Sequence, residues 1–162
     1  SSVVVVEQEA FLWNVSIEEN IRYAKPEASK GDVVAAAKLA GIHEFITTLP
    51  QGYRTFVGEL GLQLSAGQKQ RVAIARAIIQ DAPVLVFDEA TSALDGEIEN
   101  SITKALFNLL TRRTTILLSH RLQIVATADR VLVLEAGHIV QEGSVQSLLA
   151  EEGVFQRLFA KM

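Results

Sequence analysis

A serine, a glycine and two carboxylates are the residues of this 162-residue chain whose spacing suggests chemistry. Ser65 and Gly67 stand at the start of a long stretch predicted to be helical, where free backbone N–H groups and the positive end of the helix dipole attract anions. An apolar strand predicted at 84–88 then ends in Asp88 and Glu89. Carboxylates at a strand end can hold a metal ion and a water beside a nucleotide. Together these residues indicate phosphate chemistry.

The start of this helix also has a simpler interpretation. Ser65 and Gln68 match the capping-box pattern, which is common at helix starts, and few such starts bind phosphate. Gly67, however, leaves the mouth of the helix open to a ligand, and two carboxylates follow at the end of the next strand. This combination favours a binding site over a cap alone.

Polar residues also follow two other predicted strands. The run Val84–Phe87 is continuously apolar, as expected for a strand buried on both faces of a parallel sheet, and ligands bind such sheets at the carboxyl ends of the strands. A strand at 114–119 delivers His120 to the same edge, where it could donate a hydrogen bond to a developing phosphate charge or position a nearby water and carboxylate. Gln8, after a strand at 3–7, could offer its amide oxygen to a metal or a water.

The two carboxylates are expected to have different partners. Adjacent strand residues point to opposite sides of a sheet. One of them would therefore serve a magnesium ion, and the other would serve an attacking water.

The predicted elements that must position these residues change in type near residue 80. The first part is predicted to be mostly helical, with Ser16 and Glu19 as a capping box and Asp32 as the N-cap of a helix over 33–40. The second part alternates strands and helices, which predicts a βαβ unit. Its predicted elements are strand 84–88, helix 97–110, strand 114–119, a hairpin of 131–135 with 138–141, and helices 145–150 and 154–162.

Composition narrows the function further. The chain is about half apolar, which suits one globular domain, and its formal charge of −4 argues against a general affinity for nucleic acid. Without cysteine it has neither a disulfide framework nor thiolate metal sites. No apolar run is long enough to cross a bilayer. Because a β-branched strand begins at Val3, we expect the chain to be a fragment of a longer domain.

In combination these residues resemble the nucleotide-binding domain of an ABC transporter, from Gln8 almost to Met162. The run Thr55–Gly61 also resembles the X-loop TxVGExG of exporter-type members, which favours export over import. The other matching motifs are Leu64–Gln68 for the signature LSGGQ, Val84–Glu89 for the Walker B strand, Ser92–Asp95 for the D-loop, His120 for the switch histidine, and Gln8 for the Q-loop glutamine.

The resemblance implies an α/β fold of the P-loop NTPase (RecA-like) type, with a parallel sheet core, an inserted α-helical signature subdomain and a missing N-terminal part. Residues 1–162 would form a partial ABC ATPase domain. The helical subdomain would cover about 12–80, and the RecA-like catalytic subdomain would comprise 1–11 and about 81–162.

The resemblance also implies a mechanism in which two such domains dimerise head to tail around two ATP molecules. Glu89 would be the general base toward water, and His120 would contact the γ-phosphate. Asp95 would join the two sites across the dimer. The Mg²⁺ ion would be held by Asp88 and Gln8, and the partner's nucleotide by Ser65, Ala66, Gly67 and Gln68.

Two departures from the family pattern affect these expectations. Ala66 stands where the family has the first signature glycine, which would cost roughly 1 to 2 kcal/mol if the position needs a left-handed backbone. We expect a functional site that is slower than usual. The phosphate-cradling loop G-x-x-x-x-G-K-[ST] does not occur in these 162 residues, so the isolated chain is expected to bind ATP poorly and to hydrolyse essentially none.

The leading hypothesis is therefore an ATPase module of an exporter, on the cytoplasmic side of a membrane and attached there through transmembrane domains. One alternative is a non-transport ABC ATPase that acts on DNA or ribosomes, against which the X-loop counts. Another is a non-catalytic dimerisation module, against which Glu89 and His120 count.

Overall fold

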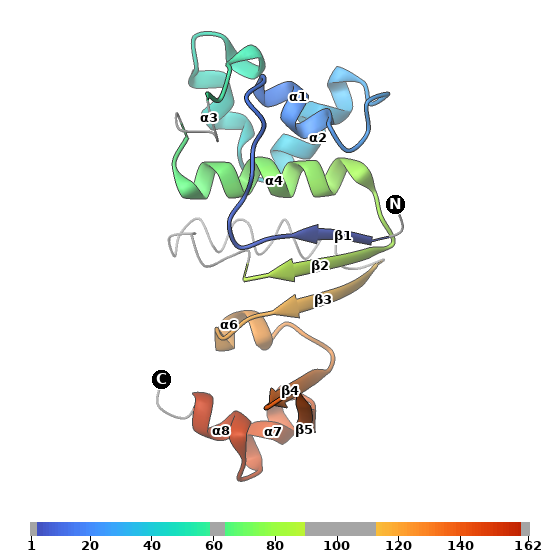
Figure 1. The fold of residues 1–162 in the computed structure, drawn as a ribbon, viewed down its shortest axis with the longest axis vertical. Coiled ribbons are helices and arrows are strands. Elements are labelled where there is room, and N and C mark those ends of the chain that lie inside the picture. Colours follow the sequence, from blue (N-terminus) through green and yellow to red (C-terminus); the bar gives the residue numbers. More distant parts are fainter. Residues whose placement is uncertain (1–2, 59–63, 90–112, 160–162) are drawn as a thin grey trace. The chain divides into compact units, whose positions relative to one another are not determined.

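The computed structural model describes residues 3–58, 64–89 and 113–159 of the chain (Figure 1). The chain divides into two compact units, residues 1–116 and residues 117–162. Within the described residues, no helix has the length and apolar character that crossing a bilayer requires.

A three-stranded sheet with β2 at its centre begins in the first unit. Its order is β1 (Val3–Val6), β2 (Val84–Asp88) and β3 (Thr114–Leu118). Strands β1 and β2 are parallel, with Val6 opposite Phe87. Parallel neighbours need a long crossover, which the helices between residues 17 and 80 provide. The sheet confirms the predicted α/β class.

One face of this sheet supplies much of the core. Val4 and Val6 of β1 are buried together with Leu85 and Phe87 of β2. Val84 and Val86 of β2 are only partly buried, so burial alternates along the strand although its first four residues are apolar. Helix α4 (Ala66–Gln80) packs against β1.

Three shorter helices cover the other side of α4 in Figure 1. They are α1 (Ile17–Arg22), α2 (Lys30–Leu39) and α3 (His43–Thr48), and a 3₁₀ turn, η1 (Gly52–Arg54), follows them. Both α1 and α2 contact α4. These helices and α4 bury small or branched apolar side chains, which are fully or almost fully inaccessible to solvent: Ile17, Ile21, Val33, Ala36, Ala37, Ile74 and Ala75.

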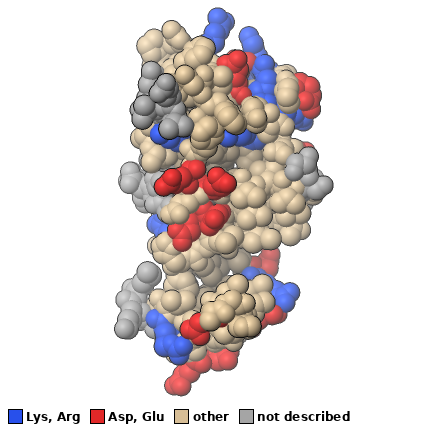
Figure 2. Space-filling model, viewed as in Figure 1, with Lys and Arg blue, Asp and Glu red and all other residues tan. Residues whose placement is uncertain are grey.

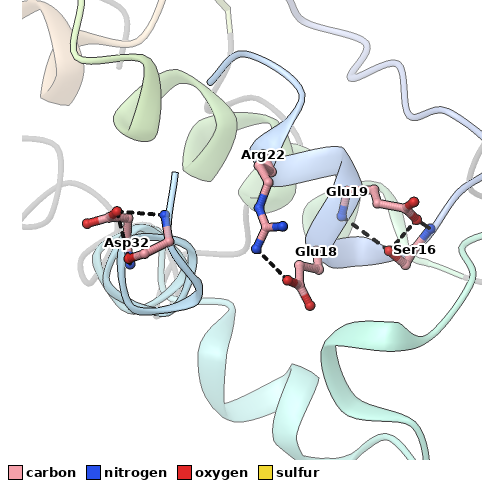
Figure 3. Close-up of polar contacts among 6 residues, drawn as sticks. Ser16, Glu18, Glu19, Arg22 and Asp32 are labelled. Carbon is pink, nitrogen blue, oxygen red and sulfur yellow. Dashed lines mark hydrogen bonds and ion pairs between the residues drawn. The ribbon is translucent and has the colours of Figure 1, made fainter. Parts of the chain in front are cut away.

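Capping boxes begin both α1 and α2, as Figure 3 shows. The Ser16 hydroxyl accepts from the N–H of Glu19, and the Glu19 carboxylate accepts from the N–H of Ser16, as predicted. The prediction for α2 was wrong. Its N-cap is Ser29, and Asp32 is the third helical residue, whose carboxylate accepts from the N–H of Ser29. The sequence supports either cap, and the helix begins earlier because Ser29 and Asp32 satisfy each other's N–H groups.

The second unit contains a hairpin and short helices. Strands β4 (Val131–Glu135) and β5 (His138–Gly143) are antiparallel. Ala136 and Gly137 join them with φ angles of 49° and 80°, typical of a two-residue hairpin turn. The helices are α6 (Leu122–Val125), α7 (Val145–Ala150) and α8 (Val154–Phe159). The core of this unit comprises Val133, Leu148, Phe155 and Phe159.

The hairpin was predicted, although its second strand runs on to Gly143, and helix 145–150 agrees with the prediction. The helix predicted over 154–162 is present as far as Phe159, and residues 160–162 lie outside the described residues. The helix predicted over 97–110 lies outside the described residues.

Candidate functional site

Ser65 caps the N-terminus of α4 in the predicted way. The N–H of Gln68 donates to Ser65 Oγ at 3.3 Å, and the N–H of Ser65 donates to Gln68 Oε1 at 2.9 Å. The N–H of Lys69 donates to the Ser65 carbonyl at 2.9 Å. The N–H groups of Ala66 and Gly67, in the first turn, have no acceptor inside the helix. The mouth of the helix therefore offers two backbone donors and a hydroxyl.

This donor set fits a phosphate group. Backbone N–H groups at the positive end of a helix dipole attract anions, and a serine hydroxyl that accepts one bond can still donate another. Ser65 and Ala66 are exposed, and Gly67 is partly so. A phosphate could therefore approach the mouth of α4 from solvent.

The backbone at Ala66, which replaces the first glycine of the signature LSGGQ, is not left-handed. It is the first residue of α4, and the described non-glycine residues with positive φ are Asp81, Glu89 and Ala136. Its methyl group therefore carries no left-handed penalty here. The substitution adds bulk at the mouth and leaves the helix geometry intact.

The carboxyl end of β2 presents Asp88 and Glu89. Strand β2 ends at Asp88, and Glu89 has a φ of 45°, which is uncommon outside glycine. The alternation of strand side chains therefore does not extend to Glu89, and the predicted reason for different partners of the two carboxylates does not hold. The turn in the backbone sets the direction of Glu89 instead.

Gln8 lies at the same edge of the sheet as these carboxylates. Because Val6 pairs with Phe87 in a parallel register, Gln8 and Glu89 each follow that pair by two residues. Gln8 and Asp88 are exposed. Figure 2 shows acidic side chains gathered over this end of β1 and β2.

The oxygen donors at this edge suit Mg²⁺. This ion is usually bound by one or two carboxylates together with waters and substrate phosphates, without a full cage of protein ligands. Residues 3–58, 64–89 and 113–159 contain no group of three acidic or histidine side chains that could hold a metal ion by themselves. One carboxylate, Asp88, together with the side-chain oxygen of Gln8 fits binding in which waters and phosphates supply the other Mg²⁺ ligands.

The two remaining predicted site residues lie outside the described part of the first unit. His120 is exposed and belongs to the second unit, whereas Glu89 belongs to the first. Asp95 lies outside the described residues, as do residues 59–61 of the X-loop.

The family model described as ABC transporter matches residues 1–92. The chain belongs to the ABC transporter family.

Individual members of the family align along almost the whole chain. An ATP-dependent lipid A-core flippase of Acinetobacter baylyi is 50% identical over 157 residues, which are 96% of this chain and 27% of the flippase. The solved structure of a bacterial Atm1-family ABC exporter with ATP bound matches with a TM-score of 0.94 at 45% identity, over 99% of this chain and 28% of that one. The chain thus spans 27% and 28% of the lengths of these two proteins.

This ABC transporter chain also has an aromatic cluster that the sequence analysis missed. The Phe11 and Trp13 rings meet edge to face with centroids 4.7 Å apart, and those of Trp13 and Tyr23 lie 5.2 Å apart. The three residues are 45%, 41% and 61% exposed. The signal in the sequence was two aromatic residues close together just after Gln8.

The described part of the X-loop is attached beside this cluster. The N–H of Ile17 donates to the Thr55 carbonyl at 3.0 Å, and the N–H of Val57 donates to the Val15 carbonyl at 3.2 Å. Phe56, between these contacts, is exposed. The X-loop and the aromatic cluster therefore share the segment that leads into α1.

The segment around Gln8 is held by polar side chains of α1 and α4. Sequence reasoning did not identify these residues. Gln70 is 1% exposed, and its Nε2 donates to the Glu7 carbonyl at 3.1 Å. Arg76 donates to the Phe11 carbonyl at 3.1 Å, and also to the carbonyl and the side-chain oxygen of Asn20. Burial lowers the pKa of the Arg76 guanidinium. The burial of Gln70 could have been predicted from the sequence, because Gln70 is in line with the apolar Ile74 and Ile78 on one helix face.

Proposed function

We propose that this chain is part of an ATP-binding and ATP-hydrolysing domain that powers export by an ABC transporter. The observation that carries the proposal is the mouth of α4, where Ser65 caps the helix and the N–H groups of Ala66 and Gly67 have no acceptor inside it. Such a mouth can bind phosphate, and membership of the ABC transporter family favours a phosphate of ATP as the ligand. The flippase and exporter relatives support export as the process.

In this proposal the residues at the mouth serve the nucleotide of a second domain. Ser65, Gly67 and Gln68 contact the γ-phosphate of the ATP held mainly by the partner, with Ala66 at the edge of the contact. Asp95 links the two sites across the head-to-tail dimer. Residues 12–80 act as the helical subdomain that presents this mouth.

The strand ends serve the chain's own nucleotide. Asp88 and Gln8 hold Mg²⁺, which when bound neutralises charge on the phosphate oxygens. Glu89 accepts a proton from the attacking water, and His120 donates a hydrogen bond to the γ-phosphate. Residues 1–11 and about 81–162 form the catalytic subdomain in which these groups stand.

The aromatic cluster supplies a surface for the transmembrane domains. Exposed apolar patches commonly mark protein interfaces, and Phe11, Trp13 and Tyr23 form one beside the X-loop. The domain would dock there from the cytoplasmic side of the membrane. Substrate choice would be made by membrane helices outside these 162 residues.

ATP hydrolysis by the full-length protein tests the proposal. The purified protein in lipid should hydrolyse ATP with a requirement for Mg²⁺. The 162-residue chain alone should hydrolyse essentially none, because it lacks the loop that cradles the phosphates. A full-length protein without ATPase activity would overturn the proposed function, and robust turnover by the isolated chain would overturn the assignment of its inactivity.

A further inference from the structure

The segment that carries Gln8 has an irregular backbone whose polar groups are bonded by side chains. Between β1 and α1, the Glu7 carbonyl accepts from Gln70 and the Phe11 carbonyl accepts from Arg76, each at 3.1 Å. Gln8 lies between these two anchored carbonyls. Both donors belong to α4, so one helix holds the segment on each side of Gln8.

The bond from Gln70 acts directly on the orientation of Gln8. A carbonyl and the amide nitrogen of the next residue lie in one rigid peptide plane. The Glu7 carbonyl and the Gln8 nitrogen belong to one such plane. Fixing the carbonyl therefore also fixes the orientation of the bond from the Gln8 nitrogen to its Cα. The Gln70 side chain is almost fully buried, which restricts the position of its donor.

The same helix links Gln8 to the mouth at Ser65. Gln70 follows Ser65 by five residues, which corresponds to a rise of about 7.5 Å along the helix. A shift of α4 caused by a phosphate at its mouth would therefore move the donor that holds the Glu7 carbonyl. No loop intervenes between the two points, because both belong to α4 and its cap.

We propose that Gln70 is a positioning residue for Gln8, through which contact at the mouth of α4 sets the placement of the Gln8 side chain. The inference rests on the proposed function, because it assigns Gln8 to the Mg²⁺ of the chain's own nucleotide. Gln70 itself touches neither the nucleotide nor the ion in this account. Its effect passes through the Glu7 peptide.

The test uses the full-length protein with Gln70→Met, which keeps the length of the side chain and removes the donor. Gln80→Met is the matched control, because it changes the same residue type on the same helix. The Mg²⁺ concentration for half-maximal ATPase activity should rise about tenfold in Gln70→Met, the lower end of the loss seen when the support of a metal ligand is removed. In Gln80→Met it should stay at the wild-type value.

A second measurement does not depend on activity. Amide hydrogen exchange in residues 7–13 should be several-fold faster in Gln70→Met than in the wild type or in Gln80→Met. Gln70→His, which keeps a donor, should restore slow exchange and the Mg²⁺ requirement. Gln70→Leu also removes the donor and introduces no buried charge, and it replaces the methionine variant in all measurements if that variant does not fold.

The Gln8→Ala variant separates positioning from a general loss of structure. If Gln70 acts through Gln8, the double variant should need no more Mg²⁺ than Gln8→Ala alone. Additive effects, or a Mg²⁺ requirement and exchange in Gln70→Met equal to those of the wild type, would overturn this inference alone. A wild-type protein that hydrolyses no ATP would overturn it together with the proposed function.

Discussion

The side-chain amide of Asn20 bonds to the backbone of Trp13 at both of its polar groups. The N–H of Trp13 donates to Asn20 Oδ1 at 2.9 Å, and Asn20 Nδ2 donates to the Trp13 carbonyl at 3.0 Å. The same side chain also donates to the Ser16 carbonyl and accepts from Arg76. One fully buried residue of α1 therefore shapes the chain just before its helix and connects it to α4.

Asn20→Leu should destabilise the protein because several buried polar groups lose their partner at once. An unsatisfied buried group costs about 1 to 3 kcal/mol, so we expect the free energy of unfolding to fall by roughly 2 to 3 kcal/mol. Urea denaturation followed by circular dichroism measures this change. Asn14→Leu, at an exposed asparagine in the same segment, should change the value by less than about 0.5 kcal/mol. Equal effects of the two substitutions would contradict the role of Asn20.

Glu89→Gln should stop hydrolysis in the full-length protein while leaving ATP binding intact. Loss of a general base lowers the rate by about 100-fold to 10,000-fold. ATP-driven dimerisation, followed by light scattering, should persist, because the amide keeps the size of the side chain. Glu9→Gln, at an exposed carboxylate on the same segment as Gln8, provides the control and should keep its turnover. Wild-type turnover in Glu89→Gln would rule out Glu89 as the base.

Acid should weaken the helix starts through Glu19 and Asp32. Bonds from the Ser16 side chain and then its backbone lower the pKa of Glu19 from 4.5, and those from Ser29 likewise lower the pKa of Asp32 from 3.8. A carboxyl group whose pKa is lower in the folded state stabilises fully above its unfolded pKa, and this stabilisation is lost as the pH falls through the folded value.

Unfolding midpoints measured from pH 6 down to pH 3 should therefore begin to decrease below about pH 4.5, the ordinary pKa of Glu19. The double variant Ser16→Ala and Ser29→Ala should show a smaller decrease over this range, because its carboxyl groups have lost the bonds that lower their pKa values. A decrease as steep as that of the wild type would show that other groups carry the acid sensitivity.

Ala66→Gly tests whether the signature alanine is strained. Because Ala66 begins α4 with an ordinary helical backbone, glycine should lower stability slightly, by no more than about 1 kcal/mol. Ala73→Gly in the middle of the same helix should have the larger effect. Thermal unfolding of the two variants measures this order. A gain in stability from Ala66→Gly would mean that the alanine is strained after all.

Short-range patterns in the sequence predicted much of the local structure. The caps at Ser16 and Ser65 were predicted because both partners lie three residues apart, so their spacing is visible in the sequence. The same pattern was ambiguous at α2, where Ser29 and Asp32 are both good N-caps. In the structure Ser29 is the N-cap, and it forms a reciprocal capping box with Asp32.

The sequence by itself determined the strand that ends in Asp88, the mouth of α4 and the family motifs, because each depends on neighbouring residues. Only the tertiary structure decided that Gln70 bonds the peptide before Gln8 and that Arg76 bonds Phe11. These partners are 63 and 65 residues apart. They meet because α4 packs against β1 after the chain has crossed over through three other helices, and no local spacing records that packing. The backbone turn at Glu89 was likewise decided by the folded chain, since nothing in an apolar strand followed by two acids requires a positive φ.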